Sequence, residues 1–310
     1  MVLEPYQAVL LVLVGVLVGI SMSFIGQTGQ GVVIPLVLLI TGDILLAIAI
    51  SVLNDLITAA AVSIGYVRKK KVVFRRDTLI LLVVGMLASS LGILILMTTP
   101  LGSAFGWALP AFIIVFGLVI LKQGFPTSET LKGMVLKLAK MVLARRGDTD
   151  GLARLEAQFQ EDKTRTITTK EEEIKGIVPP GSRLFYLLAI GLGLYVGINS
   201  GMFGANSGMI LAIVLVMLYG YPLKKGVGTA LVLGIGLCAC TFVLYQLMGY
   251  AFKGVFYWDP AITALLAAGS VASGLITSTF VQRLPAKTMG RGMAVAMLAL
   301  GAVSLIFYVS

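Results

Sequence analysis

Residues 24–42 read FIGQTGQGVVIPLVLLITG, and a loose copy of this stretch, MFGANSGMILAIVLVMLYG, occupies residues 202–220. Each copy opens with glycine, amide and hydroxyl residues and continues as a short apolar segment. At about 1.5 Å rise per residue, a segment of about 11–14 residues covers about 17–21 Å, too little for a membrane core of about 30 Å. Paired short, glycine-interrupted segments in two halves of a chain indicate a transporter's binding site. The alternative is a pair of packing glycines, because small residues let membrane helices approach closely.

A constant offset of 178 residues relates the two halves of the chain. The pairs at this offset are Gly15 and Gly193, Gly19 and Gly197, Ile20 and Ile198, Gly26 and Gly204, Gly42 and Gly220, Ser51 and Thr229, and Thr28 and Asn206. Because each half holds five apolar segments, the second half begins on the opposite side of the membrane from the first. The sequence therefore predicts an inverted-topology repeat, a layout that recurs among secondary transporters.

The composition indicates an all-α, polytopic membrane protein. The chain has 310 residues, of which 58% are hydrophobic and only 12% charged, with a mean hydropathy of +1.00. Soluble domains carry about 25% charged residues. We predict ten transmembrane segments, at about 7–25, 28–41, 43–67, 78–98, 105–121, 183–202, 206–219, 222–248, 259–282 and 288–309. They divide the chain into a first repeat (1–121), a connector (122–182) and a second repeat (183–310).

Basic residues set the orientation of the segments. Lys and Arg gather in the loops at 68–76, 224–225 and 283–291 and in the connector, whereas Lys253 lies alone in a loop on the other side. The positive-inside rule then makes these basic loops and the connector cytoplasmic, in a cytoplasmic membrane. The aromatic residues at the predicted outer boundary are typical of an interfacial belt. They are Tyr250, Phe256, Tyr257 and Trp258.

The connector at 122–182 has two interpretations. Its first part shows apolar residues at helical spacing among lysines and arginines, which is typical of a basic amphipathic helix on the membrane surface. A solvated linker that joins the two halves is the alternative.

The sequence gives no sign of an enzyme. It contains no His, which removes the usual imidazole metal ligand and most nucleophile–base pairs. Cys238 and Cys240 lie two residues apart within an apolar run, so on a helix they face different directions and are expected to be core residues. We therefore predict no cofactor and no metal. The net charge of +10 is explained by the basic loops and does not indicate nucleic-acid binding.

Polar residues at membrane depth are the candidate substrate ligands. Helix N-termini at the two breaks would offer backbone N–H groups and a partial positive charge, which suit an anion. Because no Lys or Arg lies inside a segment, dipoles and neutral donors would hold that anion. The predicted substrate-binding residues are Gly26, Gln27, Thr28, Gln30, Ser51, Asn199, Gly204, Asn206, Ser207 and Thr229.

Asp55 is the ionisable residue that we place well inside a segment. A charge there costs about 2.5–3.5 kcal/mol, so its default interpretation is functional. Ser51, Asp55 and Thr58 share one face of a helix. Asp55 could couple transport to protons or bind a cation such as sodium. The alternative is a neutral, hydrogen-bonded Asp that ties helices together, with Asn54 nearby.

The chain resembles the sulfite exporter TauE/SafE family, also called the toluene sulfonate uptake permease family. The resemblance rests on GQTGQGVVIP at 26–35 and on GANSG followed by YGYPLKKGVGTA in the second half. It implies export or uptake of a small sulfur-containing anion, such as sulfite or an organosulfonate. Gln27 and Gln30 depart from the family's more uniform glycine run.

We therefore expect a secondary transporter that works by alternating access in the lipid bilayer. The alternatives are an anion channel or passive facilitator, and a membrane scaffold that transports nothing. An oligomer is compatible with the sequence, which does not fix the direction of flux, the coupling ion or the particular anion.

Overall fold

The computed structural model describes residues 3–26, 30–73, 76–98, 183–204, 208–217 and 219–285, a few residues within 114–122, and most of those within 288–302. All regular secondary structure in these residues is helical, which confirms the predicted all-α class. The predicted segment at 105–121 and the connector at 122–182 lie almost entirely outside the described residues. The division of the chain into two repeats and a connector therefore stays a prediction.

The helices follow the predicted segments closely. They are α1 (Pro5–Ile25), α2 (Gln30–Thr41), α3 (Ile44–Arg68), α4 (Arg76–Thr98), α9 (Arg183–Phe203), α10 (Gly208–Met217), α11 (Leu223–Lys253) and α12 (Pro260–Val281). Five of them, α1, α3, α4, α11 and α12, are long and apolar enough to cross a membrane. The helices α2 and α10 are short, as predicted. The protein is thus an integral membrane protein.

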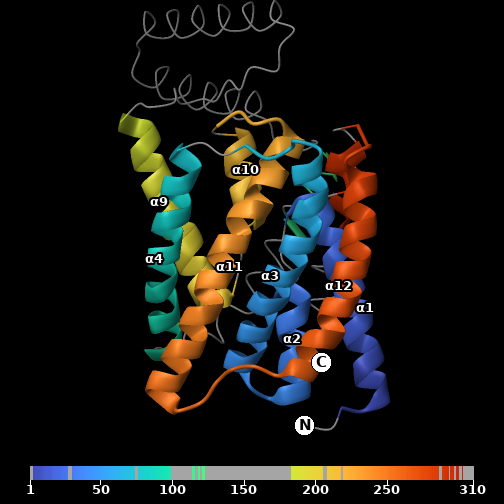
Figure 1. Ribbon diagram of the computed structural model, residues 1–310, viewed down its shortest axis with the longest axis vertical. Coiled ribbons are helices and arrows are strands. Elements are labelled where there is room, and N and C mark those ends of the chain that lie inside the picture. Colours follow the sequence, from blue (N-terminus) through green and yellow to red (C-terminus); the bar gives the residue numbers. More distant parts are fainter. Residues whose placement is uncertain are drawn as a thin grey trace, which may run out of the picture.

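The helices form a bundle with α3 and α11 in the middle (Figure 1). These two helices pack against each other; α12 and α1 lie on the outer side of α3, and α4 and α9 lie on the outer side of α11. The most extensive helix contacts join the halves of the chain, α1 with α12 and α9 with α4. The short helices α2 and α10 each pack on the long helix that follows them.

Helix positions repeat at the predicted offset of 178 residues. Both ends of α1 and α9 match at this offset, and α2 and α10 begin at matching residues. The left-handed glycines also match: Gly26 (φ 67°) with Gly204 (φ 61°), and Gly42 (φ 70°) with Gly220 (φ 69°). In Figure 1, α3 runs upward and α11, its counterpart, runs downward. These two corresponding helices therefore run in opposite directions.

Other glycines of the repeat serve close helix packing. A Cβ on Gly15 would collide with the carbonyl oxygen of Leu266 in α12, and a Cβ on Gly197 with the carbonyl oxygen of Gly85 in α4. Small residues allow this approach of two membrane helices. For these positions the packing interpretation of the repeated glycines is confirmed.

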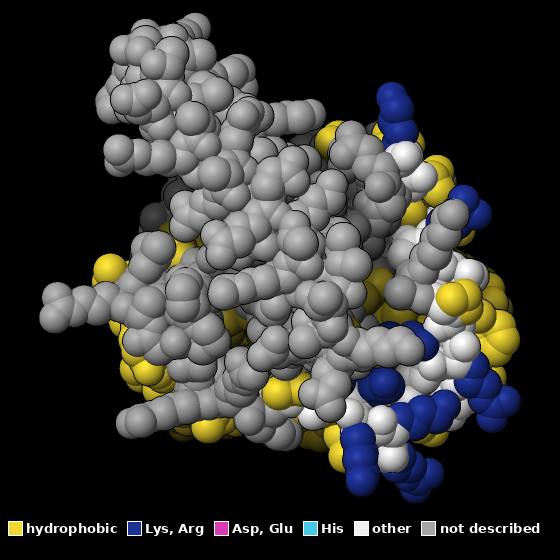
Figure 2. Space-filling model, turned by 90° about the horizontal axis from the view of Figure 1, so that it is seen from above, with side chains coloured by type: hydrophobic (Ala, Val, Ile, Leu, Met, Phe, Trp, Pro, Cys, Tyr) yellow, Lys and Arg dark blue, Asp and Glu magenta, His cyan; other side chains and the backbone are white. Residues whose placement is uncertain are grey.

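The two ends of the bundle differ in character. Figure 2 shows the end at which α3 ends and α11 begins, where Lys and Arg side chains gather along one side. Lys253, at the end of α11, lies at the opposite end. There Tyr250 and Phe256 are exposed and stack with their ring centroids 5.1 Å apart, and Trp258 is exposed nearby, as expected for a belt. Tyr257 was wrongly predicted to join them: it is buried, because its ring packs against Gly249.

Candidate functional site

The two breaks begin where α1 and α9 end in a left-handed glycine. At the first break, the N–H of Gly26 donates to the carbonyl oxygen of Met22 at 2.9 Å, and the backbone then turns out of the helix. Gly204 holds the same conformation after α9. A left-handed residue is the usual way to stop a helix, and glycine adopts it without strain.

Each break lies against the middle helix of the other half. A Cβ on Gly26 would lie 3.6 Å from Val227 Cγ1 and 3.7 Å from Leu231 Cγ, both on α11. A Cβ on Gly204 would lie only 2.8 Å from the Cγ2 atoms of Ile48 and Val52, both on α3. Because α3 and α11 are antiparallel, the breaks contact opposite ends of this central pair.

A buried tyrosine anchors the helix end before each break. The hydroxyl of Tyr66 on α3 donates to the carbonyl oxygen of Ser23 at 2.7 Å, and the hydroxyl of Tyr245 on α11 donates to that of Gly201. Ser23 and Gly201 are equivalent at the 178-residue offset. These bonds satisfy carbonyl groups that a helix end leaves without partners. Neither tyrosine was predicted, because a single hydroxyl group within an apolar segment forms no recognisable sequence pattern.

The predicted ligands Ser51 and Thr229 occupy equivalent places with different surroundings. Thr229 is buried on α11, and its Oγ1 accepts a hydrogen bond from the Val73 N–H at 3.0 Å, which ties the loop after α3 to α11. Ser51 is buried on α3, next to Val52, which contacts the second break. Thr229 therefore lies at the depth of Gly26, and Ser51 at the depth of Gly204.

A polar cluster fills the middle of the bundle between α3 and α12. Thr58 donates to Ser270 Oγ at 2.7 Å, and Ser270 donates to Asn54 Oδ1 at 3.1 Å. Asp55 is also fully buried, near the middle of α3. Asn54 thus links α3 to α12 through Ser270. Ser270 was not predicted, because a lone serine in an apolar helix is a weak signal.

Two donors in this cluster have no partner among the described residues. They are Ser51 Oγ and Asn54 Nδ2, and both are buried from solvent. A buried polar group without a partner costs about 1–3 kcal/mol and calls for an explanation such as a bound water, ion or ligand. Both donors lie within one turn of Asp55 on α3. This stretch of α3 is the candidate functional site.

The remaining predicted ligands are only partly placed. Asn199 is half-buried on α9 and donates to the carbonyl oxygen of Tyr195, one turn back in the same helix, at 2.9 Å. Gln30 begins α2. Gln27, Thr28, Asn206 and Ser207 lie outside the described residues. The structure therefore places Ser51 on the helix that Gly204 contacts, and Thr229 on the helix that Gly26 contacts.

The described residues offer little to a metal ion. Within them, no three His, Cys, Asp or Glu side chains gather in one place. Cys238 is buried, Cys240 is half-buried, and both are free thiols. Donors to the candidate site are thus hydroxyl and amide groups, and its one charge is that of Asp55.

Comparison with known proteins identifies one family for the chain. The chain matches no curated protein and no solved structure at a significant level. The family model described as "Sulfite exporter TauE/SafE" matches residues 11–304, which include every break and helix discussed above except the first turns of α1. The chain belongs to the sulfite exporter TauE/SafE family.

Proposed function

We propose that this protein is a secondary transporter that moves a small sulfur-containing anion, sulfite or an organosulfonate, across the cytoplasmic membrane. The observation that carries the proposal is the pair of buried donors, Ser51 Oγ and Asn54 Nδ2, beside Asp55 in the middle of α3. Polar and ionisable groups at membrane depth are expensive and mark substrate or ion pathways. The family supports a sulfur anion as the substrate.

Neutral donors suit an anion that must be released again. A hydroxyl and an amide can each donate to an oxyanion, and hydrogen bonds to a charged group contribute about 1.5–3 kcal/mol each. Among the residues that the structure describes, no Lys or Arg is buried in the bundle, so no fixed positive charge holds the anion there. The N-terminus of α10, the helix that follows the second break, would add a partial positive charge.

Asp55 would carry the coupling proton. An ionised carboxylate repels an anion that approaches Ser51, whereas a protonated one does not. Binding of the proton and binding of the anion would then favour each other, as linkage requires. The complete burial of Asp55 near the middle of α3 supports this role, because ionisable groups at membrane depth mark proton pathways.

Alternating access would use two inverted halves. The matching helix bounds, the matching left-handed glycines and the opposite directions of α3 and α11 support such a repeat. Rocking of one half against the other would expose the site first to one side and then to the other. The positive-inside rule places the basic end of the bundle in the cytoplasm.

Ligand-dependent stability of the purified protein tests the proposal. We expect sulfite, thiosulfate or a sulfonate such as taurine or sulfoacetate to raise the melting temperature, because a ligand that binds only the folded state stabilises it. The Ser51→Ala variant should lose about tenfold to a hundredfold in affinity, since one hydrogen bond to a charged ligand is removed. Matched carboxylates should give no shift.

Thr229→Val is the matched control for Ser51→Ala. It removes the hydroxyl at the equivalent position of α11 and leaves the Val73 N–H without its partner, so the unliganded protein should melt lower. Its affinity for the anion should stay that of the wild type. The proposal fails if folded wild-type protein shows no shift with any sulfur anion, or if Ser51→Ala binds as tightly as the wild type.

A further inference from the structure

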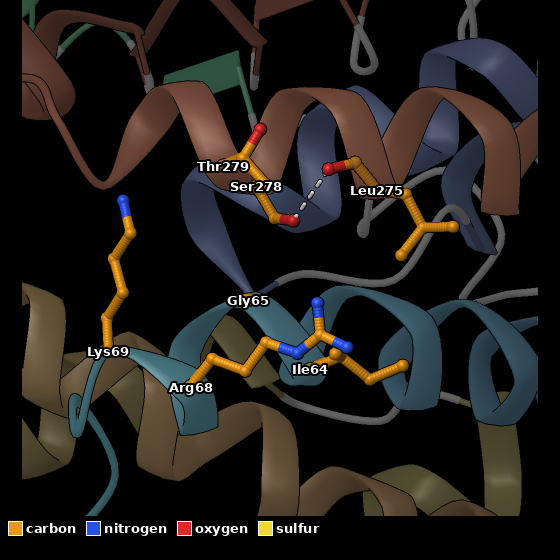
Figure 3. Close-up of a pocket in the computed structure, with 7 residues that line it drawn as sticks. All are labelled: Ile64, Gly65, Arg68, Lys69, Leu275, Ser278 and Thr279. Carbon is orange, nitrogen blue, oxygen red and sulfur yellow. Dashed lines mark hydrogen bonds between the residues drawn. The ribbon is translucent and has the colours of Figure 1, made fainter.

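A pocket outside the proposed transport site opens between the end of α3 and the end of α12, at the basic end of the bundle (Figure 3). Its volume is about 110 Å³. Gly65, Arg68 and Lys69 line it from α3, and Ser278 lines it from α12. The transport proposal uses none of these residues.

The polar side of the pocket is positively charged. Arg68 and Lys69 are exposed, and Figure 3 shows both side chains extending from α3 toward α12. Opposite them lies Ser278, whose hydroxyl donates to the carbonyl oxygen of Leu275 at 3.1 Å, whereas the hydroxyl of Thr279 points away from α3 and donates to that of Ile276. No Asp or Glu is among the residues that line the pocket. Arginine and lysine side chains recognise a phosphate or similar oxyanion.

A buried amide without a described partner lies beside this group. Gln282 is only 6% exposed, and neither Oε1 nor Nε2 of its side chain has a hydrogen-bond partner among the described residues. Its Nε2 lies 3.0 Å from the position that a Cβ on Gly65 would take, and Ser278 Oγ lies at the same distance. Glycine at position 65 therefore lets α3 pass close to the shielded amide and to the Ser278 hydroxyl. The backbone of Gln282 is itself fixed, because its carbonyl oxygen accepts from Lys224 Nζ at 2.8 Å.

The other side of the pocket is apolar and faces outward. Ile64 and Leu275 line it, and they are 44% and 40% exposed. On the same turns, Val67 of α3 and Ile276 of α12 are also exposed. In a membrane protein, exposed apolar side chains of spanning helices contact lipid chains. Binding of a free anion does not require these apolar residues. A phospholipid, by contrast, has an anionic headgroup joined to hydrocarbon chains.

We propose that this pocket binds the phosphate group of an anionic phospholipid. Arg68 and Lys69 hold the phosphate, and an acyl chain follows Ile64 and Leu275 down the bundle. Basic pockets between transmembrane helices are known to bind anionic headgroups. The bound lipid bridges α3 and α12 and so stabilises their contact at the basic end. This inference does not depend on the nature of the transported anion.

Native mass spectrometry of the protein released from nanodiscs tests the proposal. The nanodiscs contain phosphatidylglycerol and phosphatidylcholine in equal amounts, and we expect selective retention of phosphatidylglycerol. The double variant R68Q/K69Q should bind this lipid about tenfold to thirtyfold more weakly, because each surface cation contributes to attraction of an anionic lipid. Lys253→Gln, which removes a cation from the opposite end of the bundle, is the matched control and should bind as the wild type.

A second variant guards against a general charge effect. Gly65→Ala changes no charge, but its methyl group would press on Gln282 and Ser278, so it should also weaken retention of phosphatidylglycerol. Equal retention by R68Q/K69Q and Lys253→Gln would overturn the proposal. So would displacement of the lipid by millimolar inorganic phosphate, because that outcome identifies a site for a free anion. Sulfur-anion binding by R68Q/K69Q should match the wild type, which separates this test from that of the transport site.

Discussion

The break at Gly26 lies against α11, whereas the break at Gly204 lies against α3, and the two supporting helices differ in chemistry. On α3, residues 54 and 55 are Asn and Asp; at the equivalent positions of α11 stand Val232 and Leu233. Ser51 has no described hydrogen-bond partner, whereas Thr229 is held by the backbone of Val73. The two halves therefore share a backbone pattern, while the buried Asn54 and Asp55 of α3 have no polar counterparts on α11.

This difference separates the features that the two halves share from those that only the first half has. Left-handed glycines and tyrosines that bond to the helix ends occur in both halves, because both halves need them to form a break between helices. A buried carboxylate costs free energy wherever it lies, so a second copy would add cost without adding a second function. The asymmetric residues of α3 are accordingly the ones to which the transport proposal assigns substrate and proton.

The largest effect is expected when Asp55 on α3 is replaced by the residue type at the equivalent position of α11. Asp55→Leu gives α3 the residue that α11 carries at position 233. Flux driven by a proton gradient in proteoliposomes should fall by a factor in the range of about 5–150, the usual size of coupling between two ligands. Thermal stability should not fall, because a buried carboxylate at mid-membrane is costly. Gradient-driven flux equal to that of the wild type would remove Asp55 from the coupling mechanism.

Gly26 and Gly204 should differ in how well each position tolerates a side chain. Gly204→Ala places a Cβ 2.8 Å from Ile48 and Val52 in a left-handed conformation, and should lower the free energy of unfolding by about 2–4 kcal/mol. Gly26→Ala has the same backbone conformation but 3.6 Å of room, so a loss of about 1–2 kcal/mol is expected. Denaturant unfolding in mixed micelles measures both. Equal losses would show that packing against α3 and α11 is alike.

The smallest effects should be equal in the two halves. Tyr66→Phe and Tyr245→Phe each remove one hydrogen bond to a carbonyl oxygen just before a break. Hydrogen bonds between membrane helices contribute about 0.6 kcal/mol on average, so each variant should lose about that much stability. The same unfolding measurement applies. A loss in only one of the variants would contradict the equivalence of the two anchors.

Much of the fold could be predicted because membrane helices are governed by local pattern. Apolar length identified α1, α3, α4, α11 and α12, and glycine-rich interruptions identified the short helices α2 and α10. Lys and Arg in the loops anticipated the basic end of the bundle. Tyr257 was misplaced because a boundary aromatic can face lipid or core, and Gly249, which makes room for its ring, is not part of that pattern.

The candidate site was only partly predictable. Asp55 and Ser51 stood out because a polar residue inside an apolar helix is costly wherever it packs. Their different surroundings could not be foreseen: whether a hydroxyl meets a backbone N–H, as Thr229 does, depends on which loop arrives beside it. Ser270 and Tyr245 lie far along the chain from their partners on α3 and α9, and sequence spacing carries no information about such pairs.

The sequence by itself determined a helical membrane protein, its short paired segments and its family, because hydrophobic length, glycine and charge act locally along the chain. Only the tertiary structure decided that each break rests on the middle helix of the other half, and that one of these helices carries the buried donors. The physical reason is that packing joins residues about 200 positions apart, such as Asn54 and Ser270 with a separation of 216. No local pattern can specify which faces of two apolar helices meet.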